Sequence, residues 1–367
     1  MLPFYVLFLL RILSFVVGFV LVFSILISAV RTFVLPRSAP DQLVRVVFIV
    51  MRNVFDFRIS FERTYGRRDE IMALYAPFTL VILPAVWLVC VLVGYIAMFW
   101  ATTGQPLYAL YKISGSSLFT LGYATLDDIV TTSLIFTEAA IGLFLVALLI
   151  AYLPTMYAAF SKREATVTML EVRAGSPPSA ITLLTRFHAL NRLNLLNELW
   201  TTWELWFVDI DETHTSLAAL AFFRSPQPDR SWVTAAGAVL DAAALASSTL
   251  DIPKDTQADL CIRAGFLALR HISDFFGIAY DPNPHPDDPI SITRKEFDDA
   301  YDALAGAGVP LKRNRDDAWK NFRGWRVNYD RVLIHLAGLT MAPHAPWSSD
   351  RAVRTHASFR LSRKKAA

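Results

Sequence analysis

The sequence predicts an all-α membrane protein with three transmembrane helices, a re-entrant loop between the second and third, and an α-helical cytoplasmic domain. The 367 residues are 54% hydrophobic and 18% charged, and the apolar excess lies in the first 160 positions. Positive charge follows the first and third apolar runs, as expected for segments that face the cytoplasm. The net charge is only +3 and the chain has no dense Lys/Arg run, so we expect no nucleic-acid partner.

The first apolar run is long enough to cross a bilayer. No residue from 12 to 30 is charged, and the stretch from 3 to 30 spans a hydrocarbon core at ~1.5 Å per residue. A cleaved signal peptide would have an apolar region of about 7 to 15 residues, which this run exceeds. We therefore expect residues 1–31 to form an N-terminal transmembrane helix.

Residues 32–70 are expected to form a cytoplasmic or interfacial amphipathic segment. Between Arg31 and Glu70 there are eight arginines against five acidic residues, which places this segment inside and the N-terminus outside. Asp41 is a suitable N-cap for a helix that lies in the membrane interface or packs against the cytoplasmic domain. Its apolar positions recur every three or four residues: Leu43, Val46, Val47, Val50, Val54, Phe57 and Phe61.

Two further apolar runs predict the second and third spans. No residue from 71 to 111 is charged, and residues 75–100 form the core of the second span. Residues 129–160 are apolar except for Glu138, and Lys162 and Arg163 then mark the cytoplasmic side. Three crossings leave the C-terminus in the cytoplasm, which predicts a multi-pass protein of the plasma (cell inner) membrane.

A short polar stretch that contains glycine separates these two spans. Pro106 is suited to begin a helix that runs to about residue 118 and directs its negative end toward a cation. It is followed by Thr120-Leu121-Gly122-Tyr123-Ala124. These five residues resemble Thr-Val-Gly-Tyr-Gly, the selectivity filter of the potassium-channel superfamily, whose backbone carbonyls replace the hydration shell of the ion. The arrangement over residues 75–160 is similar to the two-span pore module of that family.

The resemblance implies a tetrameric cation channel that conducts potassium, because one chain supplies a quarter of each carbonyl ring. The pore domain would cover residues 71–163, with an outer helix, a pore helix at 106–118, a filter at 120–124 and an inner helix at 129–160. The partners would be three further copies of the chain and the lipid bilayer. The permeant ion, K⁺ or alternatively Na⁺, would be the only metal, and we expect no cofactor.

Ala124 departs from the family pattern, since it replaces the second filter glycine. The family backbone has a positive φ there, so a Cβ costs on the order of 1 kcal/mol. A rotated or widened outer carbonyl ring would weaken selectivity for potassium. A weakly selective sodium and potassium channel is therefore the alternative within the same class.

Polar side chains around the filter are candidates for supporting roles. Four copies of Asp127 and Asp128 would form a negative outer vestibule, although both residues also suit the cap of the third span. Glu138 is an intramembrane carboxylate that would either bond to hydroxyls behind the filter or face the pore mouth. The hydroxyls in question belong to Ser114, Ser116 and Ser117.

Gly142 and Pro154 in the third span resemble the positions at which inner helices of the family bend to open the pore. Close packing of a small residue and a kink near the helix end would explain the same two residues. Both interpretations stay open at this point.

Residues 164–367 are expected to form a helical cytoplasmic domain that assembles or gates the pore. We expect Thr293 and Glu296 to form a capping box and Asp316 to cap the last helix. Prolines at alternate positions predict a loop at 281–289. The expected helices lie near 179–207, 214–224, 231–250, 256–278, 293–306 and 316–340.

The cytoplasmic domain shows no recognisable catalytic or nucleotide-binding motif, so we do not expect an enzyme. Acidic residues at 209–212 precede His214 but lack the spacing of a calcium-binding loop. Cys90 and Cys261 lie in different environments and are expected to stay unpaired. An unknown cytoplasmic ligand is compatible with this domain, and a non-conducting membrane receptor or scaffold is the alternative from another functional class.

Overall fold

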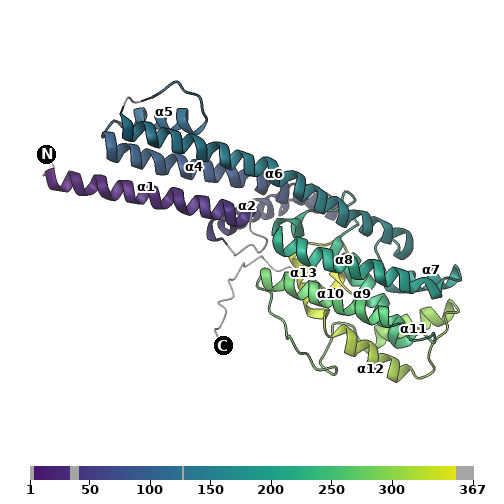
Figure 1. Cartoon of the computed structure of the whole chain (residues 1–367). Coiled ribbons are helices and arrows are strands. Elements are labelled where there is room, and N and C mark those ends of the chain that lie inside the picture. Colours follow the sequence, from purple (N-terminus) through teal and green to yellow (C-terminus); the bar gives the residue numbers. More distant parts are fainter. Residues whose placement is uncertain (1–3, 34–40, 126–127, 353–367) are drawn as a thin grey trace. The chain divides into compact units, whose positions relative to one another are not determined.

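The computed structural model describes residues 4–33, 41–125 and 128–352, and these residues are almost entirely helical (Figure 1). Helices account for 76% of the structure, and the described residues form no strand. A single isolated β-bridge joins Leu250 and Leu311. The all-α prediction is therefore confirmed.

Three helical stretches are long and apolar enough to span a membrane. They are α1 (Phe4–Phe33), the pair α3 (Tyr65–Ala73) and α4 (Tyr75–Thr103), and α6 (Ile129–Ala174). A helix satisfies its own backbone hydrogen bonds, which is why such runs are stable without water. The third of them is longer than predicted, because α6 continues beyond residue 160 without a break as far as Ala174.

The chain divides into two compact units. The first consists of Met1–Val54 and Ala76–Tyr157, and the second consists of Phe55–Tyr75 and Ala158–Ala367. Both α4 and α6 therefore pass from one unit into the other along the chain.

In the first unit, α1 and α4 pack closely where two glycines meet. A Cβ on Gly18 would lie 2.4 Å from the carbonyl oxygen of Gly94, so only glycine permits this approach. Ser14 Oγ donates a hydrogen bond of 2.9 Å to the carbonyl of Ala97 on α4. Trp87 fills the core of this unit, and its ring meets that of Phe33 edge-on at 5.1 Å.

The amphipathic helix α2 (Gln42–Ile59) begins as predicted. The Asp41 carboxylate accepts the backbone N–H groups of Leu43 and Val44 at 3.0 and 3.1 Å, so Asp41 is confirmed as an N-cap. Side chains on one face of α2 are exposed, including Val46, Val50, Val54 and Phe57. Their location in a membrane interface stays a prediction.

The second unit is a helical domain built around α9 (Trp232–Thr249), an alanine-rich helix that is buried almost throughout. Small side chains let other helices approach α9 from several sides, and it packs against α7, α10, α12 and α13. Besides α3, α9 and the C-terminal part of α6, this unit contains α7 (Ala180–Ala189), α8 (Leu196–Ser216), α10 (Thr256–Phe275), α11 (Arg294–Gly306), α12 (Arg315–Arg326) and α13 (Asp330–Thr340), with 3₁₀ turns η1 (Leu193–Leu195), η2 (Ala218–Phe222) and η3 (Ser349–Arg351).

Three of the predicted helices are wrong in extent. The one predicted at 179–207 is interrupted after Ala189, where Asn191 adopts a left-handed conformation with φ 57°. The segment 214–224 contains only the end of α8 and the 3₁₀ turn η2. The helix predicted at 316–340 is two helices, because the Asn328 side chain donates to the carbonyls of Gly324 and Trp325 in the intervening turn.

Two capping predictions have opposite outcomes. The capping box of Thr293 and Glu296 is confirmed at the start of α11. Asp316 is not the cap of α12, because Asn314 Oδ1 accepts the N–H groups of Asp316 and Asp317 at 3.1 and 3.2 Å. The loop predicted at 281–289 is confirmed, since these residues contain no helix.

Candidate functional site

The candidate site lies at the C-terminal end of α5 (Leu107–Leu118), the short helix between α4 and α6 (Figure 1). Pro106 precedes its first residue as the N-cap with φ −65°, the angle to which its ring restricts it, so α5 begins one residue after the predicted start at 106 and ends at the predicted residue 118. Ser114, Ser116 and Ser117 on α5 are buried. Buried hydroxyls need hydrogen-bond partners, and these three residues organise the site.

α5 ends in a Schellman motif in which Thr120 has φ 56°. Its N–H donates to the carbonyl of Ser117 at 2.9 Å, and the N–H of Leu121 donates to the carbonyl of Ser116 at 2.7 Å. Glycine is the usual residue here, and a Cβ costs about 1 to 2 kcal/mol in this conformation. Thr120 is therefore part of the helix terminus and not the first residue of an extended segment.

Positive φ angles in this stretch occur at Thr120 and at Gly122, whose φ is 72°, but not at Ala124. The strain that we expected at Ala124 is therefore absent, and the strained residue with a side chain is Thr120. Gly122 adopts its angle at no steric cost because it has no Cβ.

Four consecutive backbone N–H groups after Thr120 converge on Ser116. Those of Leu121 and Gly122 lie 2.7 and 3.5 Å from its carbonyl oxygen. Those of Tyr123 and Ala124 donate to its side-chain Oγ at 3.0 and 3.1 Å. One serine thus accepts the amides of the whole segment.

The carbonyl groups of residues 120–123 consequently point away from α5. In a trans peptide the C=O of one residue is opposite to the N–H of the next, and no peptide in this segment is cis. When four successive N–H groups turn toward one residue, the four carbonyls that precede them turn to the other side. This orientation directs four adjacent carbonyl oxygens to the side opposite Ser116.

The other two serines attach α5 to its neighbours. Ser117 Oγ donates to the carbonyl of Ile135 on α6 at 2.6 Å. Ser114 Oγ lies 2.5 Å from Glu138 Oε1 and 3.3 Å from the carbonyl of Leu92 on α4. The helix that carries the filter-like segment is therefore linked by hydrogen bonds to both long helices.

Glu138 is fully buried behind this segment. Of the three predicted hydroxyls, that of Ser114 forms a hydrogen bond with its carboxylate. Beside it, Tyr95 Oη on α4 donates to Thr137 Oγ1 on α6 at 2.9 Å, a link that the sequence analysis did not identify. The available signal was a tyrosine and a threonine within otherwise apolar spans.

Gly142 is a point of close contact between α6 and the end of α5. A Cβ at this position would lie 2.2 Å from the carbonyl oxygen of Leu118. Close packing therefore accounts for this glycine. Pro154 lies inside the continuous helix α6, and a hinge at either residue stays a prediction.

Of the two predicted vestibule residues, the structure describes only Asp128. Asp127 lies outside the described residues. Asp128 caps α6, because its Oδ1 accepts the N–H groups of Val130 and Thr131 at 3.0 and 3.1 Å. A role for Asp128 in attracting cations stays a prediction.

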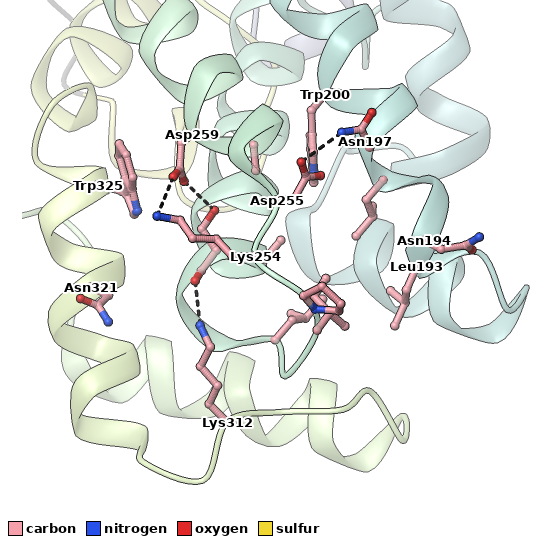
Figure 2. Close-up of a pocket in the computed structure, with 17 residues that line it drawn as sticks. Leu193, Asn194, Asn197, Trp200, Lys254, Asp255, Asp259, Lys312, Asn321 and Trp325 are labelled. Carbon is pink, nitrogen blue, oxygen red and sulfur yellow. Dashed lines mark hydrogen bonds and ion pairs between the residues drawn. The ribbon is translucent and has the colours of Figure 1, made fainter.

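The second compact unit contains a pocket of about 680 Å³ between α8, α10 and α12 (Figure 2). Its two carboxylates already have partners within the protein. Asp255 accepts from Asn197 at 3.1 Å, and Asp259 accepts from Ser247 Oγ at 3.1 Å. Lys312 donates to the carbonyl of Ser247 at 2.9 Å and so caps α9.

The acidic residues near His214 do not form a metal site in the described part of the chain, which holds no group of three potential ligands. Asp209 forms an ion pair with Lys162 at 2.5 Å, and Asp211 lies 2.8 Å from His271 Nδ1. His214 is buried, and burial together with the nearby Arg163 holds its pKa well below 6.5.

These features define an all-helical chain with three helices long and apolar enough to span a membrane, and with a short helix and polar segment between the second and third. Comparisons with protein-family models, with curated protein sequences and with solved structures found no match.

Proposed function

We propose that the protein is a tetrameric cation channel that conducts potassium through a filter of backbone carbonyls contributed by residues 120–124. The observation that carries this proposal is the convergence of four N–H groups on Ser116. A ring of carbonyl oxygens can replace the water around a dehydrated cation, and four chains would close each ring.

The size of α5 supports a re-entrant loop. Its 12 residues extend ~18 Å, which is too short to cross a hydrocarbon core of about 30 Å. The chain must then enter and leave the bilayer on the same side between α4 and α6. Non-helical backbone is stable at such a depth only when protein covers it or water reaches it.

The exposed side chains around the segment support assembly with further copies. Phe119, Leu121 and Tyr123 are 55%, 63% and 63% exposed in the single chain. A cluster of exposed apolar side chains usually marks a surface that is buried in an interaction. Adjacent subunits around a central pore would bury these three. By the positive-inside rule, we infer a plasma-membrane protein whose N-terminus is outside the cell and whose C-terminal domain is in the cytoplasm.

The alternative within the same class is a channel that conducts sodium and potassium with little selectivity, since Ala124 replaces the second filter glycine and the strained residue is Thr120 instead. Purified protein in liposomes with potassium inside and sodium outside distinguishes the two through the reversal potential. A value near the potassium equilibrium potential supports the selective channel, and a value near zero supports the weakly selective one. No flux under any applied voltage or pH would contradict both and favour a receptor or scaffold.

A further inference from the structure

The segment Leu220 to Arg224, at the end of η2, contacts both helices that lead toward the proposed filter. On one side it contacts α6, and on the other it contacts the region where α3 passes into α4. All of these contacts lie within the second compact unit. We call residues 220–224 the brace.

The contacts with α6 centre on Arg163, whose side chain is fully buried. Its Nη1 donates to the carbonyl of Leu220 at 2.9 Å, and its Nη2 donates to the carbonyl of Phe223 at 2.7 Å. The ring of Phe160, one turn earlier on α6, lies 5.7 Å from that of Phe223. Removing these acceptors would leave a buried charge without partners and would strongly destabilise the folded protein. The contact between the brace and α6 is therefore stable.

The contacts with α3 and α4 involve the other residues of the brace. The Arg224 guanidinium forms an ion pair with Asp69 on α3, and its Nη2 also donates to the carbonyl of Thr340 at 2.7 Å. Tyr75, the first residue of α4, is buried, and its ring lies 5.5 Å from that of Phe222. Neighbouring brace residues thus bind two different helices.

We propose that the brace ties the first residues of α4 to α6 and holds the pore closed at rest, an inference that rests on the proposed channel function. Bending of α6 at Gly142 or Pro154 would displace the part of the helix that follows, including Phe160 and Arg163. That part cannot move away from Tyr75 while residues 220–224 hold both. Release occurs at the pair of Arg224 and Asp69, because this contact is nearer the surface than the buried Arg163.

Separation of α3 from the brace can be measured with the full-length protein in lipid. Spin labels on Glu70→Cys and Ser161→Cys report the distance between α3 and α6, in a background that lacks Cys90 and Cys261. Labelled subunits are diluted with unlabelled ones so that each assembly reports one pair. Arg224→Gln removes the ion pair from the brace, and Asp69→Asn removes it from α3 with little change in shape.

We expect both variants to broaden the distance distribution and to raise resting potassium flux about tenfold, the change that the loss of one charge-assisted hydrogen bond causes in an equilibrium. Arg323→Gln is the matched control, because Arg323 on α12 pairs with Asp287 in the loop 281–289 and not with a residue of α3 or α6. It should change neither reading.

The two readings separate this inference from the proposed function. An unchanged distance distribution in both variants overturns the brace whatever the flux. A changed distribution with unchanged flux through a conducting wild type overturns its role in closing the pore. If neither wild type nor variants conduct, the channel function and the closing role both fail, and the distances alone decide whether the brace exists.

Discussion

Ser116 occupies a position in which one side chain and its own carbonyl accept four amides. Its hydroxyl reaches the N–H groups of both Tyr123 and Ala124 while the side chain itself stays buried. The neighbouring Ser114 and Ser117 bind other elements, so none of the three can substitute for another.

Ser116→Ala should shift the reversal potential toward zero and lower the stability of the folded protein by about 1 to 3 kcal/mol. The reason is that the N–H groups of Tyr123 and Ala124 lose their acceptor. Reversal potentials and thermal unfolding of the same preparations check both effects. Ser133→Ala is the control, since this exposed hydroxyl only donates to the carbonyl of Ile129 on its own helix. Selectivity and stability that match the control would contradict the role given to Ser116.

His214 makes stability depend on pH. Its Nε2 lies 3.2 Å from Nη1 of Arg163, and because arginine always donates, the histidine accepts and its ring is neutral. Burial keeps its pKa in the folded state well below 6.5, while the unfolded chain takes up a proton as the pH falls through about 6.5. The unfolded state then binds more protons, so stability is full above this pH and decreases below it.

As the pH falls from 6 to the pKa of the folded state, we expect the free energy of unfolding of the wild type to decrease by up to ~1.4 kcal/mol more per pH unit than that of His214→Gln. Glutamine can still accept from Arg163 but does not titrate. Unfolding curves followed by tryptophan fluorescence at several pH values provide the comparison. If the stability of the two proteins depends on pH in the same way, His214 is not responsible for the loss of stability at low pH.

At the scale of elements, α5 and α6 are held together by one close approach and two serine contacts. Gly142→Ala should destabilise the protein by about 1 to 3 kcal/mol, because its Cβ would overlap the carbonyl oxygen of Leu118. Gly66→Ala on α3 is the control: nothing lies within 4 Å of a Cβ there, and alanine favours the helix. Thermal unfolding distinguishes them. If Gly142→Ala is as stable as Gly66→Ala, α6 can shift at this point without a cost in stability.

The three long helices were predictable because uncharged runs of this length have few alternatives. The caps at Asp41 and Thr293 were predictable for a similar reason, since their patterns are local. The break between α12 and α13 was not, because the periodicity continues through a turn that Asn328 creates with its side chain.

The candidate site was predicted in its location but not in its backbone geometry. Residues 120–124 follow α5 as expected. The placement of positive φ at Thr120 and not at Ala124 depends on the Schellman motif, which residue types do not reveal when the left-handed residue is a threonine. The contact of Glu138 with Ser114 was one of several open possibilities, and only packing selects it.

At the scale of the whole molecule, the proposed filter requires four chains. Native mass spectrometry or light scattering in detergent should give a protein mass about four times 41.2 kDa. The apolar side chains of Leu121 and Tyr123 would become protected from solvent in this assembly. A monomer, dimer or trimer that still conducts cations would rule out a carbonyl ring formed by this segment.

The way in which residues 121–124 are fastened has a consequence for evolution. They are bound through main-chain amides, which every amino acid except proline possesses. The side chains at positions 121, 123 and 124 can therefore diverge while the backbone keeps its course, provided that a serine stays five to eight positions upstream and that position 122, with φ 72°, stays glycine. In distant homologues the features retained would be this serine, the glycine at 122 and the absence of proline, and not the tyrosine that follows the glycine.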